Sequence, residues 1–244
     1  MAIHIYNYKI KYSDVGTDNK LSLKALANIL QESAISHSDL AGYGVNNIEN
    51  THLAWLLLNW KIQIFLRPNC NEELTVKTWP RTFDKLYSFR DFEVYNKNNE
   101  LVAIGSSKWF PIDTQNKKIR KITPEISEAY GEPVTKSVFD DPFKTKFIAP
   151  ENSNLSFIYS VQRRDIDTNG HVNNVKYLEL AYEALPEDVY KNANFKNIDI
   201  LYKHSAFLGE EMCIGFDRQV VDGEEQYTVV IKSNDKLNAI IRLS

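Results

Sequence analysis

Apolar and polar positions alternate along most of the chain, which is typical of antiparallel β-strands, and helical spacing appears in a few segments. The first part predicts a strand over Ile3–Tyr12, a helix over Leu21–Ser36 and a second helix over His52–Leu58. Runs rich in β-branched and aromatic residues predict the strands that follow: Lys61–Leu66, Leu74–Phe83, Tyr87–Asn96 and Leu101–Ile112.

The second part repeats this order of elements. It predicts a strand over Phe157–Arg164, a helix over Asn173–Leu185 and three or four strands over Asn197–Leu243. The stretch between the two parts, Asp113–Ser153, holds four of the eight prolines, which indicates a linker with a short helix near Pro124–Tyr130. A helix that precedes an antiparallel sheet buries its apolar stripe by lying across that sheet. We therefore expect an α+β protein of two tandem units.

Self-similarity within the sequence supports two copies of one unit. The segment Asp14–Ser22 aligns without gaps on Asp165–Asn173, 151 residues downstream. Two later pairs of segments align at shorter offsets, 138 and 136 residues: Asn71–Val76 with Gly209–Ile214, and Asn98–Ile104 with Asn234–Ile240. The predicted organisation is a first unit over residues 1–112, a linker over 113–153 and a second unit over 154–244. Tandem units of this kind can pair their sheets edge to edge and cover open strands.

Composition narrows the class of protein. The chain has 244 residues, of which 43% are hydrophobic and 25% charged, as in ordinary globular proteins. No apolar run approaches the roughly 18 residues that a membrane span needs, and the N-terminal residues do not resemble a secretory signal, so we expect a cytoplasmic protein. The net charge of −3 argues against a nucleic-acid partner, because nonspecific nucleic-acid binders usually carry a basic excess.

The cysteines give no support for a metal site or a disulfide framework. Only Cys70 and Cys213 occur, and they lie far apart without metal-ligand spacing. Motifs for a nucleophilic serine, for phosphate binding and for dinucleotide binding are all missing from the sequence. We therefore expect chemistry that needs neither a metal nor a cofactor.

Candidate chemistry lies where the two aligned segments differ. The second copy carries Asp167, Asn169 and His171, where the first has Gly16, Asp18 and Lys20. A turn needed only to connect strand and helix could be built the same way in both copies, so the difference favours chemistry. A carboxylate, an amide and an imidazole meet here at a helix start, where free backbone amides can stabilise an oxyanion and a histidine can act as base.

Structural roles are the alternative for the same residues. Asp, Asn and Gly are common in turns and as helix N-caps, and most single histidines are not catalytic. Either Asn173 or Asn174 is expected to cap the second helix. Glu32 and Glu183 align in the two copies, which favours a structural role for both.

The run Arg164-Asp-Ile-Asp-Thr-Asn-Gly-His-Val-Asn-Asn-Val-Lys-Tyr-Leu-Glu179 resembles the active-site segment of the acyl-acyl carrier protein thioesterases, the plant fatty-acid-releasing enzymes and their bacterial relatives. The resemblance extends over nearly the whole chain and includes segments of the first half: Trp55, Leu74–Pro80, Ser88–Glu93, Ser107–Trp109 and Asp113. It implies a tandem double hotdog, in which two antiparallel sheets each wrap around a long helix. It also implies that Asp167, Asn169 and His171 are catalytic in hydrolysing an acyl thioester.

One departure from the family concerns the segment Tyr202–Ala206. Plant members have Tyr-Arg-Arg-Glu-Cys here, with a Glu in the site, so Ser205 replaces the Glu and Ala206 the Cys. A cysteine nucleophile at that position is excluded, and Ser205 can at most hydrogen-bond a water. The prediction is water attack assisted by His171 and Asp167, with Asn169 and helix-end amides holding the thioester oxygen. Direct attack by Asp167 is the alternative, and Ser205 and Asn173 are expected beside the site.

The resemblance also sets expectations for substrate and partner. The first unit would supply the acyl pocket, and its helix carries an apolar stripe: Leu23, Leu26, Ala27 and Leu30. The acidic carrier protein is expected to dock on a basic patch, for which the candidates are Lys117, Lys118, Arg120 and Lys121. A homodimer is possible. The alternatives are a hotdog acyl-CoA thioesterase and a noncatalytic acyl-binding module, and the acyl chain length cannot be read from the sequence.

Overall fold

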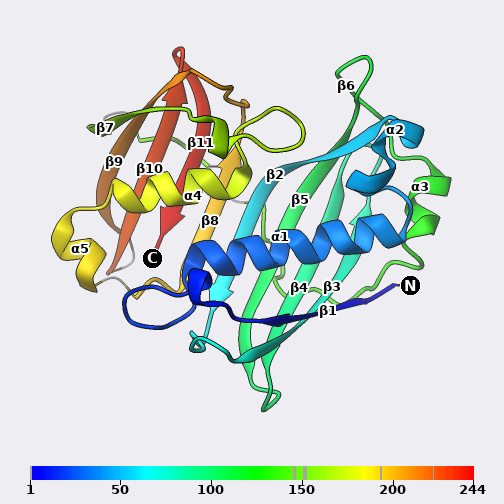
Figure 1. The fold of residues 1–244 in the computed structure, drawn as a ribbon, viewed down its shortest axis with the longest axis horizontal. Coiled ribbons are helices and arrows are strands. Elements are labelled where there is room, and N and C mark those ends of the chain that lie inside the picture. The colour runs from blue at the N-terminus through cyan, green and yellow to red at the C-terminus, as the bar shows by residue number, and fades with distance from the viewer. Residues whose placement is uncertain (1, 145–146, 151–152, 193, 222) are drawn as a thin grey trace. The chain divides into compact units, whose positions relative to one another are not determined.

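The computed structural model describes residues 2–144, 147–150, 153–192, 194–221 and 223–244. The chain divides between Pro142 and Phe143 into two compact units, called unit 1 and unit 2 below. Within each unit a helix lies across antiparallel strands (Figure 1). No helix among the described residues is both long and apolar enough to cross a membrane.

Unit 1 carries one long helix on a five-stranded antiparallel sheet. Its described residues also form two short α-helices, two 3-10 turns and a short sixth strand. Its elements in chain order are β1 (His4–Lys9), η1 (Tyr12–Asp14), α1 (Leu23–Leu40), η2 (Val45–Asn47), α2 (Ile48–Thr51), β2 (Leu53–Ile64), β3 (Glu73–Phe83), β4 (Ser88–Asn96), β5 (Leu101–Asp113), β6 (Lys118–Ile119) and α3 (Pro124–Ala129). The strands lie in the order β1-β3-β4-β5-β2, and β6 pairs with the end of β5.

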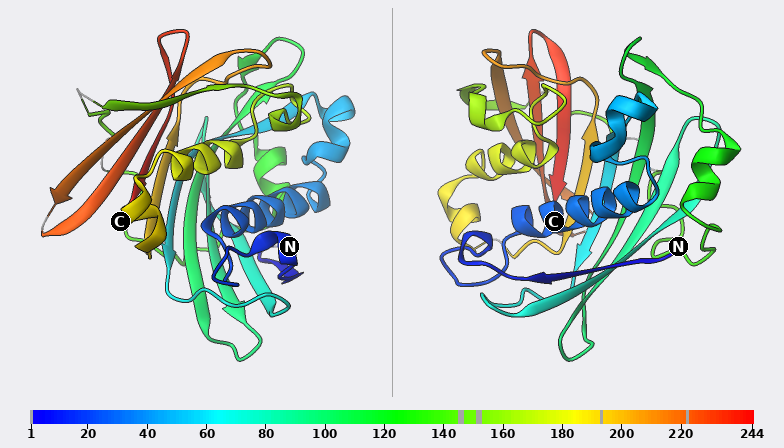
Figure 2. Two further views of the ribbon diagram at one scale, coloured as in Figure 1. Left: turned by 60° about the vertical axis from the view of Figure 1, so that its left-hand side comes forward. Right: turned by 45° about the vertical axis from the view of Figure 1, so that its right-hand side comes forward.

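Helix α1 lies across this sheet, as both views in Figure 2 show, and its apolar stripe is buried. Ser22 caps the helix by accepting a hydrogen bond from the Ala25 amide, and Leu26 and Leu30 are fully buried. A Cβ atom on Gly105 of β5 would come within 3.3 Å of Leu30 Cδ1. The glycine therefore lets the helix approach the strand closely.

Unit 2 repeats this plan with fewer residues. Its elements are β7 (Asn154–Ser160), η3 (Arg163–Asp165), α4 (Asn174–Glu183), α5 (Glu187–Asn192), β8 (Asn197–Tyr202), β9 (Glu211–Val221), β10 (Glu224–Ser233) and β11 (Lys236–Leu243). The strand order is β8-β11-β10-β9-β7, and all neighbours are antiparallel. Helix α4 buries Tyr177, Leu178 and Leu180 in the core of this unit.

The helix predicted over His52–Leu58 is wrong. Leu53 instead begins strand β2, which pairs with β5 from Leu53 opposite Asp113 to Ile64 opposite Ala103. Only a single helical turn, α2, precedes it, and it ends at His52 in a left-handed conformation with φ 52°. The leucine run has no clear period, so pairing with a long neighbouring strand decides its conformation.

The segment expected to be a linker packs largely on unit 1. In α3, Ile126 and the following Tyr130 are buried against Leu53, and the Tyr130 hydroxyl donates to Ser38 Oγ at 3.0 Å. The short helix expected near Pro124–Tyr130 is therefore confirmed. Residues 145–146 and 151–152 of the expected linker lie outside the described residues.

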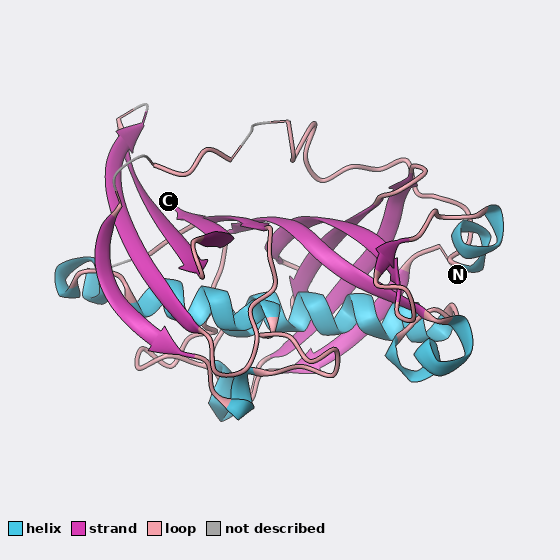
Figure 3. Cartoon of the chain, turned by 90° about the horizontal axis from the view of Figure 1, so that it is seen from above, coloured by secondary structure: helices cyan, strands magenta, loops and turns pink. Residues whose placement is uncertain are grey.

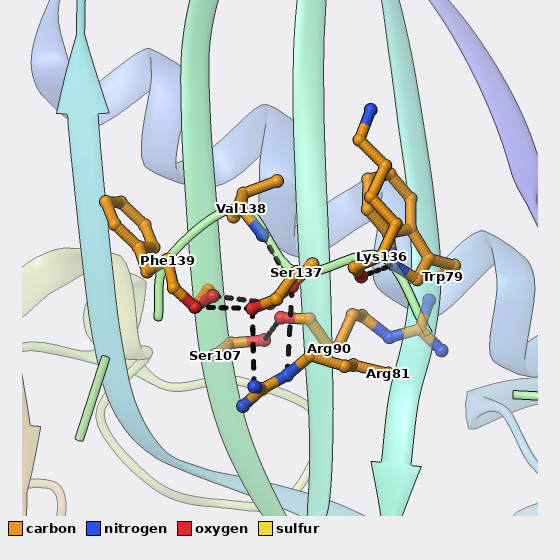
Figure 4. A network of polar contacts seen from close by, with 10 residues as sticks. Trp79, Arg81, Arg90, Ser107, Lys136, Ser137, Val138 and Phe139 are labelled. Carbon is orange, nitrogen blue, oxygen red and sulfur yellow. Dashed lines mark hydrogen bonds and ion pairs between the residues drawn. The ribbon is translucent and has the colours of Figure 1, made fainter. Parts of the chain in front are cut away.

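After α3 the chain crosses the face of the unit 1 sheet opposite α1 (Figures 3 and 4). Trp79 Nε1 donates to the carbonyl of Lys136 at 3.1 Å, and the amide of Val138 donates to Asp91 Oδ2 at 3.1 Å. Asp91 is fully buried and also accepts from the Ser106 hydroxyl. Burial raises the pKa of the Asp91 carboxyl, and these hydrogen bonds act against that rise. The crossing segment is thus fixed by a buried carboxylate of β4.

Replacement of Ile126 by Ala tests whether α3 is part of the core of unit 1. Ile126 is 1% exposed, so the change should lower the free energy of unfolding by about 2–5 kcal/mol in urea titrations. Ile119 in β6 is 55% exposed, and Ile119→Ala should cost less than about 0.5 kcal/mol. Equal small effects of the two changes would show that α3 is only loosely attached.

Candidate active site

The three candidate catalytic residues lie on one tight turn between η3 and α4. The amide of Asp167 donates to the carbonyl of His171 at 2.8 Å, and the amide of Gly170 donates back to the carbonyl of Asp167 at 3.0 Å. Gly170 has φ 79°, a left-handed conformation that glycine adopts without steric cost. Residues 167–171 therefore form a tight loop shortly before the start of α4.

The side-chain carboxylate of Asp167 stabilises this turn by accepting hydrogen bonds from its backbone amides. Its Oδ1 atom accepts hydrogen bonds from the amide of Asn169 at 2.8 Å and from the amide of His171 at 3.2 Å. The structure therefore joins Asp167 to His171 through the main chain. No hydrogen bond among the described residues links the carboxylate to the imidazole ring or to the Asn169 side chain.

Unit 1 contains the same turn, as the sequence alignment predicts. The amide of Gly16 donates to the carbonyl of Lys20 at 3.0 Å, and Asn19 donates to the carbonyl of Gly16 at 3.0 Å. Asn19 has φ 60°, so it takes the left-handed conformation that Gly170 takes in unit 2. The duplication thus extends to individual backbone hydrogen bonds.

A carboxylate with a structural role precedes each turn; it is buried in unit 2 and half-buried in unit 1. In unit 2, Asp165 Oδ2 accepts from the Tyr159 hydroxyl at 2.7 Å and from the Gln162 amide at 2.8 Å, and Oδ1 lies 3.2 Å from Lys176 Nζ. In unit 1, Asp14 accepts the corresponding hydrogen bonds from the Tyr8 hydroxyl and the Lys11 amide. Burial works to raise the pKa of Asp165, but these partners outweigh it and the pKa is lowered.

The two turns differ in what covers them. In unit 1, Arg67 Nη1 forms an ion pair with Asp18 at 2.8 Å, and Arg67 Nε donates to the carbonyl of Leu21 at 2.8 Å. Asp18 Oδ1 also accepts from the Lys20 amide at 3.1 Å. Burial opposes ionisation of Asp18, yet the amide and Arg67 leave its pKa lowered.

In unit 2 this ion pair has no counterpart. The amide of Val172 donates to the carbonyl of Ala206 at 3.0 Å, just as Leu21 donates to Pro68 at 2.8 Å in unit 1. Ser205 therefore occupies the position of Arg67, and Asn169 that of Asp18. Both are exposed. The charged pair that covers the first turn is replaced in the second by two short, neutral, polar side chains.

His171 is half-buried. Its ring makes a T-shaped contact with the ring of Phe207, and the two ring centroids lie 5.1 Å apart. Among the described residues no hydrogen bond to the imidazole nitrogens is found. A half-exposed imidazole with free nitrogens can accept a proton from a water molecule.

The start of α4 offers fewer amides than its sequence suggests. Asn173 is the N-cap, as one of the two predicted alternatives has it, and its side chain accepts from the Val175 amide at 3.0 Å. The amides of Asn173 and Lys176 donate to the carbonyls of Asp165 and Asn173. From Val172 to Lys176, only the Asn174 amide has no acceptor among the described residues. One backbone donor is thus left for an oxyanion.

The proposed docking residues lie around β6. Lys117, Lys118 and Lys121 are exposed, whereas Arg120 is half-buried and donates from Nη1 to the carbonyl of Thr51 at 2.7 Å. The Arg120 side chain therefore links the segment after β6 to the end of α2. The three lysines are the residues of this set that can face a partner.

Two residues near the site were not identified from the sequence. Asp165 aligns with Asp14, and identical residues in both copies were a signal for a structural role. Phe207 lies on a loop 36 residues beyond His171, and no spacing rule connects them. Phe207 and its neighbour Leu208 are both exposed apolar side chains, at 47% and 54%.

Comparison with known proteins identifies the family of the chain. The family model of the acyl-ACP thioesterase N-terminal domain matches residues 2–130, and that of the C-terminal domain matches residues 149–242. The chain belongs to the acyl-ACP thioesterase family.

Named relatives resemble the chain in sequence, and solved structures resemble it in fold. The chain is 25% identical, over 81% of its length, to oleoyl-acyl carrier protein thioesterase 2 of Arabidopsis thaliana, of which it spans 59%. Its fold matches an acyl-ACP thioesterase from Bacteroides thetaiotaomicron with a TM-score of 0.84 at 22% identity, over 99% of this chain and 96% of that one. A 12:0-ACP thioesterase from Umbellularia californica gives 0.85 at 19% identity, over 99% and 92%. The fold is the tandem double hotdog expected from the sequence.

The lowered pKa of Asp165 predicts how the protein responds to acid. A folded-state pKa below the unfolded value of about 3.9 means that the ionised group stabilises the fold at neutral pH. That contribution is lost as the pH falls through the folded-state pKa. Asp165→Asn should therefore lower the stability at pH 7 and flatten its loss on acidification, as measured by urea unfolding over a pH series. The exposed Asp235→Asn is the control, and equal pH profiles for the two variants would contradict the assignment.

Proposed function

We propose that this protein hydrolyses fatty acyl thioesters carried on acyl carrier protein, releasing the free fatty acid and the free thiol of the carrier. Membership of the family supports the reaction class, and the names of the relatives state that class for those proteins. The observation that carries the proposal is the difference between the two turns. Asp167, Asn169 and His171 replace Gly16, Asp18 and Lys20 only where the covering Arg67–Asp18 pair is also missing.

The proposed mechanism is attack by water. His171 accepts a proton as the water oxygen bonds to the thioester carbonyl carbon, and the carbonyl becomes an oxyanion. In this proposal the Asn169 side chain and the amide of Asn174 donate to that oxygen, and one such donor contributes on the order of 10²–10³ in rate. The C–S bond then breaks, and the proton held by His171 passes to the departing sulfur. The products are a fatty acid and a thiol.

Asp167 acts in this mechanism by fixing the turn that presents the other two residues. One of its oxygens accepts two amide hydrogens, which stabilises the carboxylate and weakens it as a nucleophile. This favours water attack over direct attack by Asp167. We expect the Ser205 hydroxyl to hydrogen-bond the water, and a serine hydroxyl cannot act as a strong base.

Several sequence predictions stay predictions. They are the acyl pocket in the first unit, a homodimer, a cytoplasmic location, and the absence of any cofactor. Leu26 and Leu30, offered as pocket residues, are fully buried within unit 1. An acyl-bound complex is the measurement that would assign the pocket.

The substrate proposal is tested by comparing one acyl chain on two carriers. Hydrolysis of the acyl carrier protein thioester should proceed with a higher kcat/KM than hydrolysis of the matching coenzyme A thioester. Faster turnover of the coenzyme A ester would instead make the protein an acyl-CoA thioesterase. Thermal stabilisation by acyl thioester without release of free acid would identify a noncatalytic acyl-binding module.

The role of His171 is tested with a matched pair of histidine variants. His171→Ala should lower kcat by about 10²–10⁴, the usual contribution of a general base, and should leave the melting temperature nearly unchanged. His204→Ala is the control, because that side chain is exposed on the loop that also carries Ser205. Full activity in His171→Ala, or an equal loss in both variants, would refute the assignment.

Docking of the carrier is tested at the three exposed lysines. Changing Lys117, Lys118 and Lys121 together to Glu should raise KM for the carrier-linked substrate several-fold and leave KM for a small acyl thioester unchanged, because acidic partners are steered by opposite charge. Arg120 is kept, since its side chain bonds to the carbonyl of Thr51 at the end of α2. An equal change for both substrates would place the carrier elsewhere.

A further inference from the structure

The loop that follows β8 is attached to the catalytic turn through Ala206. Its carbonyl accepts a hydrogen bond from the Val172 amide at 3.0 Å, and its amide donates to the hydroxyl oxygen of Tyr177 at 3.3 Å. Tyr177 belongs to α4 and is 2% exposed, and Ala206 is fully buried. Both polar groups of one loop residue are thereby fixed to the same helix and its preceding turn.

The residues on either side of Ala206 are Ser205 and Phe207. Ser205 takes the position of Arg67, and Phe207 makes the T-shaped contact with the ring of His171 at 5.1 Å. A shift of Ala206 would move both. The Phe207 ring is the only described aromatic ring in contact with His171, so the loop sets one side of the space in which the imidazole can turn.

The duplication provides an internal control for the Tyr177 bond. The aligned residues of unit 1 are Leu26 for Tyr177 and Pro68 for Ala206. Proline has no amide hydrogen and leucine has no acceptor, so this bond cannot exist in unit 1. The bond to the Pro68 carbonyl from Leu21 is nevertheless kept at 2.8 Å. The carbonyl bond alone is therefore enough to build the turn and attach the loop.

The phenol is suited to the role of a neutral acceptor. Burial raises its pKa to about 12, the Ala206 amide acts against the rise, and the charges of Glu210 and Asp167 add to it. At neutral pH the group is thus an uncharged hydroxyl whose oxygen accepts the amide hydrogen. An unbonded Ala206 amide in this buried place would be costly, which makes the bond a strong constraint on the loop.

We propose that Tyr177 is a positioning residue for the thioesterase reaction: by holding the Ala206 amide, it fixes the segment Ser205–Phe207 against the catalytic turn and so orients the His171 ring. The kinetic part of this inference rests on the function proposed above. The structural part, the link from the Tyr177 hydroxyl to the His171 ring, does not depend on that function.

The test is Tyr177→Phe, which removes the hydroxyl and keeps the ring. Loss of one such bond should lower kcat about tenfold and change KM by less than twofold. Tyr227→Phe is the matched control, because Tyr227 is also buried in unit 2 and its hydroxyl bonds to Glu225 instead. A second variant, Ala206→Pro, removes the amide hydrogen as unit 1 does. Combining the two changes should add no further loss of kcat.

A readout independent of activity is the NMR signal of the His171 imidazole, assigned by its loss in His171→Gln. The signal should move or broaden in Tyr177→Phe and in Ala206→Pro, and should stay in place in Tyr227→Phe. A shifted signal together with lower kcat supports the proposal. An unmoved signal in both site variants overturns it whatever the kinetics, and a moved signal with unchanged kcat also overturns it.

The same experiment separates this inference from the proposed function. A wild-type protein that releases no acid from any acyl thioester would refute the function. The His171 signal would then decide the structural link alone. A wild-type protein that hydrolyses the substrate, with Tyr177→Phe equal to it in kcat, would leave the function standing and refute the positioning role.

Discussion

Each tight turn before a helix leaves backbone amides that a side-chain carboxylate must accept, and the two units place that carboxylate differently. In unit 1, Asp18 accepts the Lys20 amide from the third position of the turn and is held by Arg67. In unit 2, Asp167 accepts the amides of Asn169 and His171 from the first position. The accepting carboxylate of unit 2 thus lies two residues earlier in the turn than that of unit 1. The third position can then carry the amide side chain of Asn169, and no arginine is needed there to pair with a carboxylate.

This change in the position of the carboxylate explains how one backbone scaffold gives a turn covered by an ion pair in unit 1 and a turn without that ion pair in unit 2. The carboxylates Asp14 and Asp165 build the approach to the turn in both units, each with a tyrosine hydroxyl and a backbone amide as partners. The scaffold therefore does not depend on the residues that differ. Asp167 holds the turn and the cap Asn173 holds the helix, so the side chains of Asn169, His171 and Ser205 are available for the proposed chemistry.

Much of the fold could be predicted from the sequence because the pattern and the repeat agree. The long helices, most strands and the helix near Pro124 were predicted from local pattern, whereas the leucine run after His52 was assigned wrongly because only its pairing with β5 makes it a strand. The turn residues were found by comparing the copies. Phe207 and Tyr177 could not be found that way, because their contacts with His171 and Ala206 join segments whose separation carries no periodic signal.

The most direct test of the account is to restore the covering ion pair of unit 1 in unit 2. The double change Asn169→Asp with Ser205→Arg should let an arginine pair with an aspartate across the turn, as Arg67 does with Asp18. Single-turnover hydrolysis of an acyl carrier protein thioester should then slow by at least about 100-fold with an unchanged or higher melting temperature. A variant that keeps its melting temperature and hydrolyses within twofold of the wild-type rate would contradict the claim that this turn is where the thioester is cleaved.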